Sequence, residues 1–291
     1  MSTATAAGAG TNAAVVAEPG LLLRLAGPLQ SWGERSHFNE RDTAAFPTRS
    51  GVLGLLAAAL GRGRGAPVDD LARLSLTVRA DRPGVILRDL HTVGGGLPAK
   101  ATVTTAEGKK RTGDTGTLLT HRSYLADAAF TIALTLPADA DVGAEESLLE
   151  RYAQALRSPQ WPLFLGRRSC PPEGPVLLGR SGDALHHLVH LPLAGRPPRG
   201  APQAVEFLSD RPLHRLPVPA HLNADHSDDG THPAGDINDD PISFHPRHRT
   251  HRARPLYRRA VHLPSTQYAG LGTDGLTGLV SYLNTPEGSL R

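Results

Sequence analysis

The chain has 291 residues, of which 39% are hydrophobic and 20% are charged, enough for one sizeable core or two small ones in a globular protein. Its single cysteine, Cys170, excludes an internal disulfide and a cysteine-based zinc cluster, so we expect a reducing, cytoplasmic environment. The net charge of +3 permits nucleic acid as a partner without requiring it.

Residues 1–20 contain neither Lys nor Arg and have no sustained apolar core, so they lack the features of a secretory signal. We expect them to form a disordered leader. No apolar run in the chain is long enough to span a bilayer, so we expect no membrane association.

The next part of the chain predicts alternating strands and helices. They are a strand at 21–27, a helix at 52–60, and strands at 74–81 and 128–137, followed by a helix at 145–157 and a strand at 175–179. Gly27 and Pro28 should end the first strand, and Thr48 or Ser50 should cap the first helix, which Gly61 terminates. The order βαββαβ predicts an α+β protein with a ferredoxin-like, RRM-like arrangement.

An insertion at about residues 86–124 separates the second and third strands. It alternates Thr with apolar residues around Gly-rich turns, and it contains all three lysines of the chain, Lys100, Lys109 and Lys110. This pattern predicts a protruding β-hairpin or mobile flap with a basic character.

Beyond residue 195 the sequence is rich in Pro, His and Arg and has few strand-like segments, so we expect a partly irregular C-terminal extension at 196–291. An acidic patch within 225–240 precedes a basic run at 245–259. Two histidine groups lie here, His221, Asp225, His226 and His232 in one, His245, His248 and His251 in the other. Neither has a recognised ligand spacing, so we expect no metal and no cofactor.

The start of the first helix, TRSG, is a candidate phosphate site. The first N–H groups of a helix lack internal partners and lie at the positive end of its dipole, which suits Arg49, Ser50 and Gly51 to an anion. Ordinary helix capping by Thr48 or Ser50 explains the same residues equally directly. No Gly-Lys-[Ser/Thr] follows, so the sequence does not predict nucleotide hydrolysis.

Two further groups of polar residues are candidates for RNA chemistry. Arg167 and Arg168 stand together in LGRRSCPP, where they serve either phosphate recognition or a surface ion pair. His91, His121 and Tyr124 lie at the two ends of the insertion, where together with a lysine they could catalyse acid–base cleavage of RNA if they converge. Cys170 lacks an activating neighbour, so we expect no catalytic thiol.

Five blocks occur in order between Leu21 and about Leu178: LLLRLAGPLQSWG, FPTRSGVLGLLAAALG, LRDLHTV, HRSYLADAAFTIAL and ALRSPQWPLFLGRRSCPP. In amino-acid sequence and in order these blocks resemble the CasD subunits of type I-E CRISPR Cascade complexes, which belong to the RAMP superfamily. The leader and the His/Asp-rich segment around 221–236 depart from this pattern.

The resemblance implies a ferredoxin-like palm at 21–195 that carries a β-hairpin thumb at 86–124. It implies a non-catalytic, RNA-binding subunit for antiviral defence, which grips the 5′ handle of the CRISPR RNA (crRNA) and caps the filament of CasC-like backbone subunits. The large, CasA-like target-recognition subunit would dock beside it, and contact with target DNA would be indirect.

The expected RNA contacts combine the resemblance with the charge pattern. They are Arg24, Arg49, Ser50, Gly51, Lys100, Lys109, Lys110, Arg111, Arg122, Arg167 and Arg168. The few aromatic side chains available for stacking on bases are Trp32, Phe38, Phe46 and Trp161.

Two alternatives stay open at this point. One is a metal-independent endoribonuclease that processes precursor crRNA at the repeat hairpin, with His91, His121 and Tyr124 as its active site. The other is a generic module for single-stranded RNA without preference for the handle.

Overall fold

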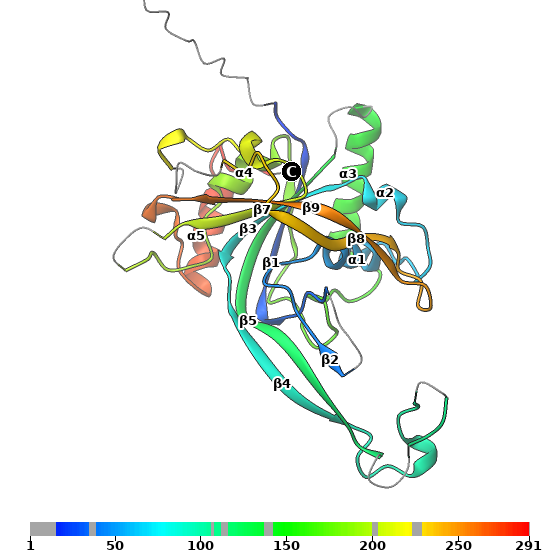
Figure 1. Cartoon of the computed structure of the whole chain (residues 1–291). Helices are drawn as coiled ribbons and strands as arrows, with labels where there is room; N and C mark the ends of the chain where they lie inside the picture. Colours follow the sequence, from blue (N-terminus) through cyan, green and yellow to red (C-terminus); the bar gives the residue numbers. More distant parts are fainter. Residues whose placement is uncertain are drawn as a thin grey trace, which may run out of the picture.

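The structure is a computed structural model that describes residues 16–34, 39–105, 108–111, 116–136, 142–199, 203–222 and 229–290 (Figure 1). Of the expected features, most of the leader, Phe38, Asp225 and His226 lie outside the described residues.

The described residues form a mixed α/β protein. Its strands are β1 (Gly20–Gln30), β2 (Glu40–Arg41), β3 (Ser75–Arg82), β4 (Val85–Val93), β5 (Leu118–Thr135), β6 (Leu177–Ser181), β7 (Val205–Ser209), β8 (Gly235–Ser243) and β9 (Thr250–Val261). Its helices are α1 (Arg49–Ala59), α2 (Asp69–Ala72), α3 (Val142–Arg157), α4 (Ala184–His190) and α5 (Thr273–Leu283).

One large sheet organises the body, with strand order β6-β1-β5-β3-β7-β9-β8 and antiparallel pairing between all of these neighbours. The two-residue strand β2 and the longer strand β4 both pair with β5 outside this path. Each of the six elements predicted before residue 180 is present, and five lie within a few residues of the expected position. The sixth, β5, begins ten residues earlier than predicted, because its first half pairs with β4.

Strand β1 is longer than its sequence indicates. Gly27 and Pro28 do not end it, because pairing with β5 continues to Gln30. Pairing with β6 reaches only Leu23, so Pro28 lies where one edge of β1 no longer has a neighbouring strand, and its missing N–H removes no ladder bond on that edge. The strand is apolar at consecutive positions because Leu21 and Leu23 face one core and Leu22 faces the other.

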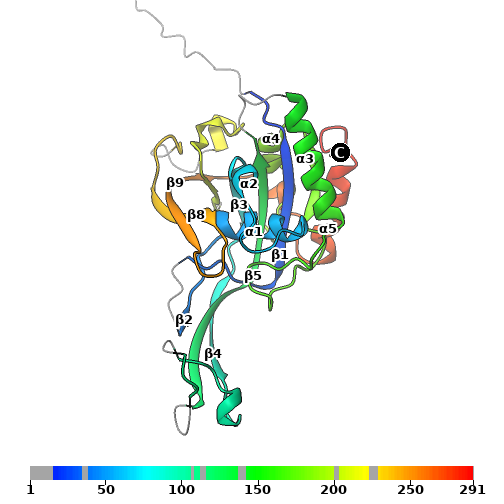
Figure 2. The ribbon, with the colours of Figure 1, turned by 90° about the vertical axis from the view of Figure 1, so that its right-hand side faces the viewer.

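The predicted insertion forms a β-hairpin made by β4 and the first half of β5, and it extends far from the body in both views (Figures 1 and 2). The second half of β5 lies between β1 and β3 in the sheet. At the junction Gly84 has a φ of +74°, and a Cβ there would lie 2.6 Å from the carbonyl oxygen of Ala126. A non-glycine residue would therefore strain the point where the hairpin leaves the sheet.

Two hydrophobic cores cover the two faces of the sheet. One core packs α1 and α3 against β1, β3 and β5, and it includes the buried side chains of Leu53, Leu56 and Tyr152. The other packs α4 against the opposite face, where the C-terminal helix α5 contributes Leu279 and Leu283 at its margin. Both faces are thus occupied, which fixes the sheet as a rigid support for the hairpin.

The C-terminal extension is more regular than expected, because β7, β8 and β9 continue the main sheet beyond β3. The expectation of few strands was wrong for a physical reason. Buried positions in β8 and β9 hold Asp239, Asp240 and Arg254. Asp239 pairs with Arg254, and Asp240 pairs with Arg49 and Arg252, so these positions do not present an apolar alternation.

Candidate nucleic-acid interface

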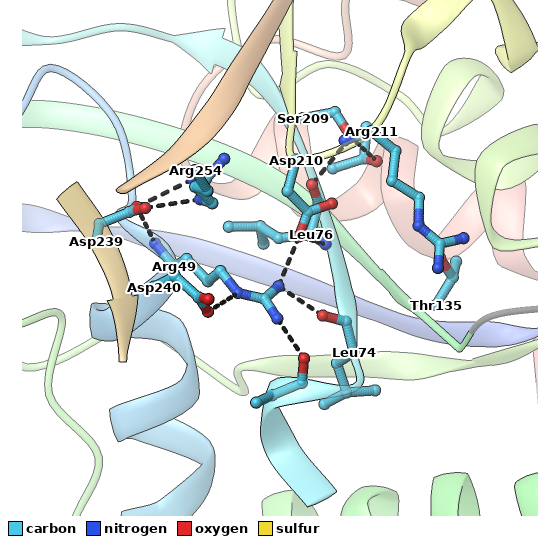
Figure 3. A network of polar contacts seen from close by, with 12 residues as sticks. Arg49, Leu74, Leu76, Thr135, Ser209, Asp210, Arg211, Asp239, Asp240 and Arg254 are labelled. Carbon is cyan, nitrogen blue, oxygen red and sulfur yellow. Dashed lines mark hydrogen bonds and ion pairs between the residues drawn. The ribbon is translucent and has the colours of Figure 1, made fainter. Parts of the chain in front are cut away.

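The start of α1 already holds an anion, which is supplied by the protein itself. The N–H of Arg49 donates to Oδ2 of Asp239 over 2.6 Å (Figure 3). Thr48 caps the helix by accepting from the N–H of Gly51 at 3.3 Å. A carboxylate at this point satisfies the unpaired N–H groups and the helix dipole. Ordinary capping plus an internal carboxylate therefore accounts for the TRSG motif.

The guanidinium of Arg49 lies inside the protein, with 7% of its side chain exposed. It forms ion pairs with Asp210 at 2.5 Å and Asp240 at 2.9 Å, and it donates to the carbonyl oxygens of Leu74 and Ala72 (Figure 3). This geometry uses nearly every donor of the side chain. The interpretation of Arg49 as a phosphate ligand does not fit this structure.

The carboxylates around Arg49 respond differently to their environment. Burial raises the pKa of Asp210 above its ordinary value despite the charge of Arg49. Burial also opposes ionisation of Asp240, but hydrogen bonds from Arg252 and Arg49 outweigh it, so the pKa of Asp240 lies below its ordinary value. We name this group the buried ion network, consisting of Arg49, Asp210, Asp239, Asp240 and Arg254.

The other two residues of the expected helix-start site are also structural. Ser50 is buried, and a Cβ on Gly51 would lie 2.6 Å from the ring of Trp32. Trp32 itself is 1% exposed and donates from Nε1 to Gln30 over 3.0 Å, so it is a core residue and not a platform for bases. Gly51 is needed for the close packing of this indole.

Arg24 and Arg167 are likewise engaged within the protein. Arg24 on β1 forms an ion pair with Glu173. Arg167 donates to the carbonyl oxygens of Ser123 (3.1 Å), Arg41 (2.8 Å) and Asp42 (3.0 Å), and its guanidinium lies 4.9 Å from the ring centre of Tyr124. Arg167 thus fastens the strand β2 to the base of the hairpin.

Three arginines remain available to a ligand at the base of the hairpin. Arg41 and Arg122 are register partners in the parallel pairing of β2 with β5, so their side chains lie on the same face. The Nε atom of Arg122 is buried and has no hydrogen-bond partner among the described residues. Arg168 is exposed beside Arg167 in the loop before β6. We call Arg41, Arg122 and Arg168 the thumb-root arginines.

The opposite face of β2 carries the compensating charges. Glu40 accepts from Nδ1 of His121 at 2.8 Å and lies 3.3 Å from Arg88. Since Glu40 and His121 are also register partners, Glu40 points to the face opposite Arg41 and Arg122, whereas Asp89, the register partner of Arg122 on β4, is on their face. Two like charges therefore lie side by side at Arg41 and Arg122, which suits a bound anion.

The basic residues farther along the hairpin differ in their freedom. Lys100 and Lys109 are exposed, whereas Nζ of Lys110 donates to the carbonyl oxygen of Thr102 over 2.9 Å. Arg111 is half-buried, and its carbonyl oxygen accepts from the hydroxyl of Thr102. Lys100 and Lys109 are accordingly the best-placed of the four to meet a phosphate.

The three residues proposed for ribonuclease activity do not converge. His91 pairs with Thr120 and Leu90 with His121, so the two histidines lie on opposite faces of the hairpin. Tyr124 shares a face with His91 but is displaced by four residues, about 13 Å along the strand. Tyr124 is also buried beneath Arg167. Because a general base and a general acid must both lie within hydrogen-bond reach of one phosphate, these three residues do not form a ribonuclease active site in this arrangement.

Sequence reasoning missed Arg41, because the segment NERD places it between acidic residues and has the composition of a solvated loop.

Of the remaining candidate aromatics, Phe46 is buried and Trp161 is 43% exposed. Within the described part of the chain, no three His, Cys, Asp or Glu side chains are grouped so as to hold a metal ion. No described helix is both long and apolar enough to cross a membrane.

A family model described as CRISPR-associated protein (Cas_Cas5) matches residues 20–257. The chain therefore belongs to the Cas5 family of CRISPR-associated proteins. The CRISPR system Cascade subunit CasD of Escherichia coli (strain K12) is 40% identical over 174 residues, which cover 55% of this chain and 70% of that protein.

Two solved structures extend this similarity to the fold. A chain of a CRISPR RNA-guided surveillance complex superimposes with a TM-score of 0.75 at 40% identity, covering 91% of this chain and 100% of the other. The structure described as a Cas protein superimposes with a TM-score of 0.54 at 31% identity, covering 87% and 99% of the two chains. The family model ends near the middle of β9, so α5 lies beyond it.

Proposed function

We propose that this protein is the CasD-like subunit of a type I-E Cascade surveillance complex, in which it grips the 5′ handle of the crRNA without cleaving it. The family and the likeness to a CRISPR RNA-guided surveillance complex support this role. The observation that carries RNA binding is the side-by-side pair of Arg41 and Arg122 at the base of the hairpin, where the buried Nε of Arg122 has no hydrogen-bond partner among the described residues and the one facing carboxylate, Asp89 on β4, forms its ion pair with His91.

In this proposal the body is a ferredoxin-like palm and the hairpin is the thumb. The thumb-root arginines hold handle phosphates, and Lys100 and Lys109 extend the contact along the thumb. The subunit caps a filament of CasC-like subunits in the cytoplasm, next to a CasA-like subunit that recognises target DNA. The separation of His91, His121 and Tyr124 supports a binding role over the alternative of precursor cleavage.

Reversal of charge at the thumb root should weaken RNA binding. We expect Arg122→Glu and Arg168→Glu each to lower the affinity for handle RNA by about tenfold, because each removes a charge-assisted contact and adds repulsion. Fluorescence anisotropy with labelled handle RNA, in the full chain assembled with its backbone subunit, measures this loss. The matched control is Arg151→Glu, the same change on exposed α3.

Equal loss of affinity in all three variants would contradict a specific site at the thumb root.

The same purified chain, incubated with precursor RNA with and without Mg²⁺, should leave the RNA intact. Metal-independent cleavage that disappears in His121→Ala would overturn the non-catalytic role.

The exposed lysines of the thumb should contribute mainly to the salt dependence of RNA binding. We expect the double substitution Lys100→Ala, Lys109→Ala to reduce the slope of log K against log salt by about 1.4, or about 0.7 for each single-strand phosphate that a lysine no longer neutralises. Lys110→Ala is the matched control, because this lysine already donates to Thr102. A slope identical to that of the unmodified chain would place both lysines away from the RNA.

A further inference from the structure

The tip of the β8–β9 hairpin carries a second concentration of positive charge, far along the sequence from the thumb. The connecting residues contain His245, Arg247, His248 and Arg249, and the exposed Arg64 belongs to the loop between α1 and α2. None of these five side chains forms an ion pair with a described residue of the protein. We call these five residues the hairpin-tip cluster.

The acidic side chains at the base of the hairpin, Asp239 and Asp240, are already used. Asp239 accepts two hydrogen bonds from Arg254 and one from the N–H of Arg49, and Asp240 is shared between Arg49 and Arg252. They therefore neutralise the base of the hairpin and leave its tip uncompensated. Burial, and after it the like charge of Arg64, lowers the pKa of Arg249 below its ordinary value.

The tip has an ordered structure and does not merely carry charge. The N–H of Arg247 donates to Nδ1 of His245 at 3.2 Å, and the N–H of His245 donates to Ser243 at 3.1 Å. The rings of His245 and His248 stack with centroids 5.2 Å apart. A Cβ on Gly65 would lie 3.1 Å from His245, so the α1–α2 loop is packed directly against the tip.

The type of ligand follows from what the cluster lacks. Single-stranded nucleic acid is usually held by aromatic side chains on which unstacked bases lie. The aromatic rings at the tip are engaged within the protein: His245 and His248 stack on each other, and Phe244 is half-buried and turned toward α1, where its Cζ is 3.8 Å from the position of a Cβ on Gly54. Clustered guanidinium groups without a stacking platform suit the phosphates of a duplex, which needs no access to its bases.

We propose that the hairpin-tip cluster binds the phosphate backbone of double-stranded DNA without reading its sequence. This surface is separate from the thumb, since the β8–β9 hairpin and the thumb project independently from the body (Figures 1 and 2). The inference goes beyond the gripping of crRNA and does not require it. The subunit would then contact DNA directly, in addition to any contact made through its partners.

The test measures binding of the full chain to a short random-sequence DNA duplex by fluorescence anisotropy over a range of salt concentrations. We expect the double substitution Arg247→Glu, Arg249→Glu to lower duplex affinity by about tenfold or more and to flatten the salt dependence. The matched control is Arg196→Glu, Arg199→Glu, the same charge change on two exposed arginines between α4 and β7. Affinity for handle RNA should not change in either variant.

Unchanged duplex affinity, or an equal loss in the control, would overturn the proposal. A loss of handle RNA binding with duplex binding intact would overturn the choice of duplex DNA. Arg64 lies outside the hairpin, so Arg64→Glu tests the same cluster without altering the strands. This substitution should give a smaller loss of duplex affinity. Because Arg122→Glu reports on the thumb and Arg247→Glu, Arg249→Glu on the tip, failure of either proposal leaves the other measurable.

Discussion

Arg49→Ala should destabilise the protein by about 3–5 kcal/mol, because it leaves buried carboxylates without their counter-charge. Asp210 would lose its ion-pair partner, and Asp240 would keep only Arg252. Two carbonyl oxygens of the α2–β3 connection would lose their donors as well. Urea unfolding followed by circular dichroism measures the loss, and the midpoint should fall without a large change in slope.

Arg252→Ala is the matched control for this prediction, because it removes the other arginine of the same carboxylate. The side chain of Arg252 is 68% exposed, so we expect its loss to cost no more than about 1 kcal/mol. If Arg49→Ala were as mild as Arg252→Ala and instead abolished binding of handle RNA, Arg49 would return to the RNA interface. The expected order of the two variants separates a structural role from a binding role.

The start and end of helix α1 were predictable from the sequence, but the group that binds at its N-terminus was not. Apolar spacing, Thr48 as the cap and Gly61 with a φ of +69° define the helix locally, so short-range sequence was sufficient. The partners of Arg49 lie 161 and 191 residues away along the chain. No local pattern predicts that a carboxylate from β8 occupies the anion site at the helix start, and TRSG in isolation is equally compatible with a phosphate.

The hairpin shows a similar division. Alternation and glycine-rich turns predicted that β4 and β5 would pair, but not which residues would be opposite one another. A register shift of one residue transfers a side chain to the other face. The separation of His91 from His121 and the pairing of Arg41 with Arg122 both depend on register, so the chemistry of this region became clear only with the strands in place.

The strands β8 and β9 of the C-terminal extension were missed because several of their buried positions are charged. In β8 and β9, Asp239 and Arg254 are 1% and 8% exposed in their side chains and pair with each other at 2.6 Å. Sequence periodicity detects apolar alternation and does not register a buried ion pair between two strands. Charged residues of this kind usually indicate solvated loops. In β8 and β9 they instead occupy buried positions at one edge of the sheet.

Arg79→Ala should also cost about 3–5 kcal/mol, since Arg79 is fully buried and its loss leaves Asp81 unpaired inside the protein. Its guanidinium lies 2.6 Å from Asp81 and donates to the carbonyl oxygens of Leu188 (2.7 Å) and Leu191 (2.6 Å) at the end of α4. Arginine at this position satisfies the last carbonyls of the helix and its negative dipole end.

The effect of Arg79→Ala should be concentrated in α4, the element that connects the first six strands to those of the C-terminal extension. Hydrogen exchange at 184–191 should accelerate more than exchange in α1, which Arg79 does not contact. Arg82→Ala is the matched control, because Arg82 is on the same strand and donates to the carbonyl oxygen of Ala194, yet its carboxylate partner Asp127 is 72% exposed. Uniform acceleration in both helices would mean that Arg79 supports the whole sheet and does not specifically anchor α4 to it.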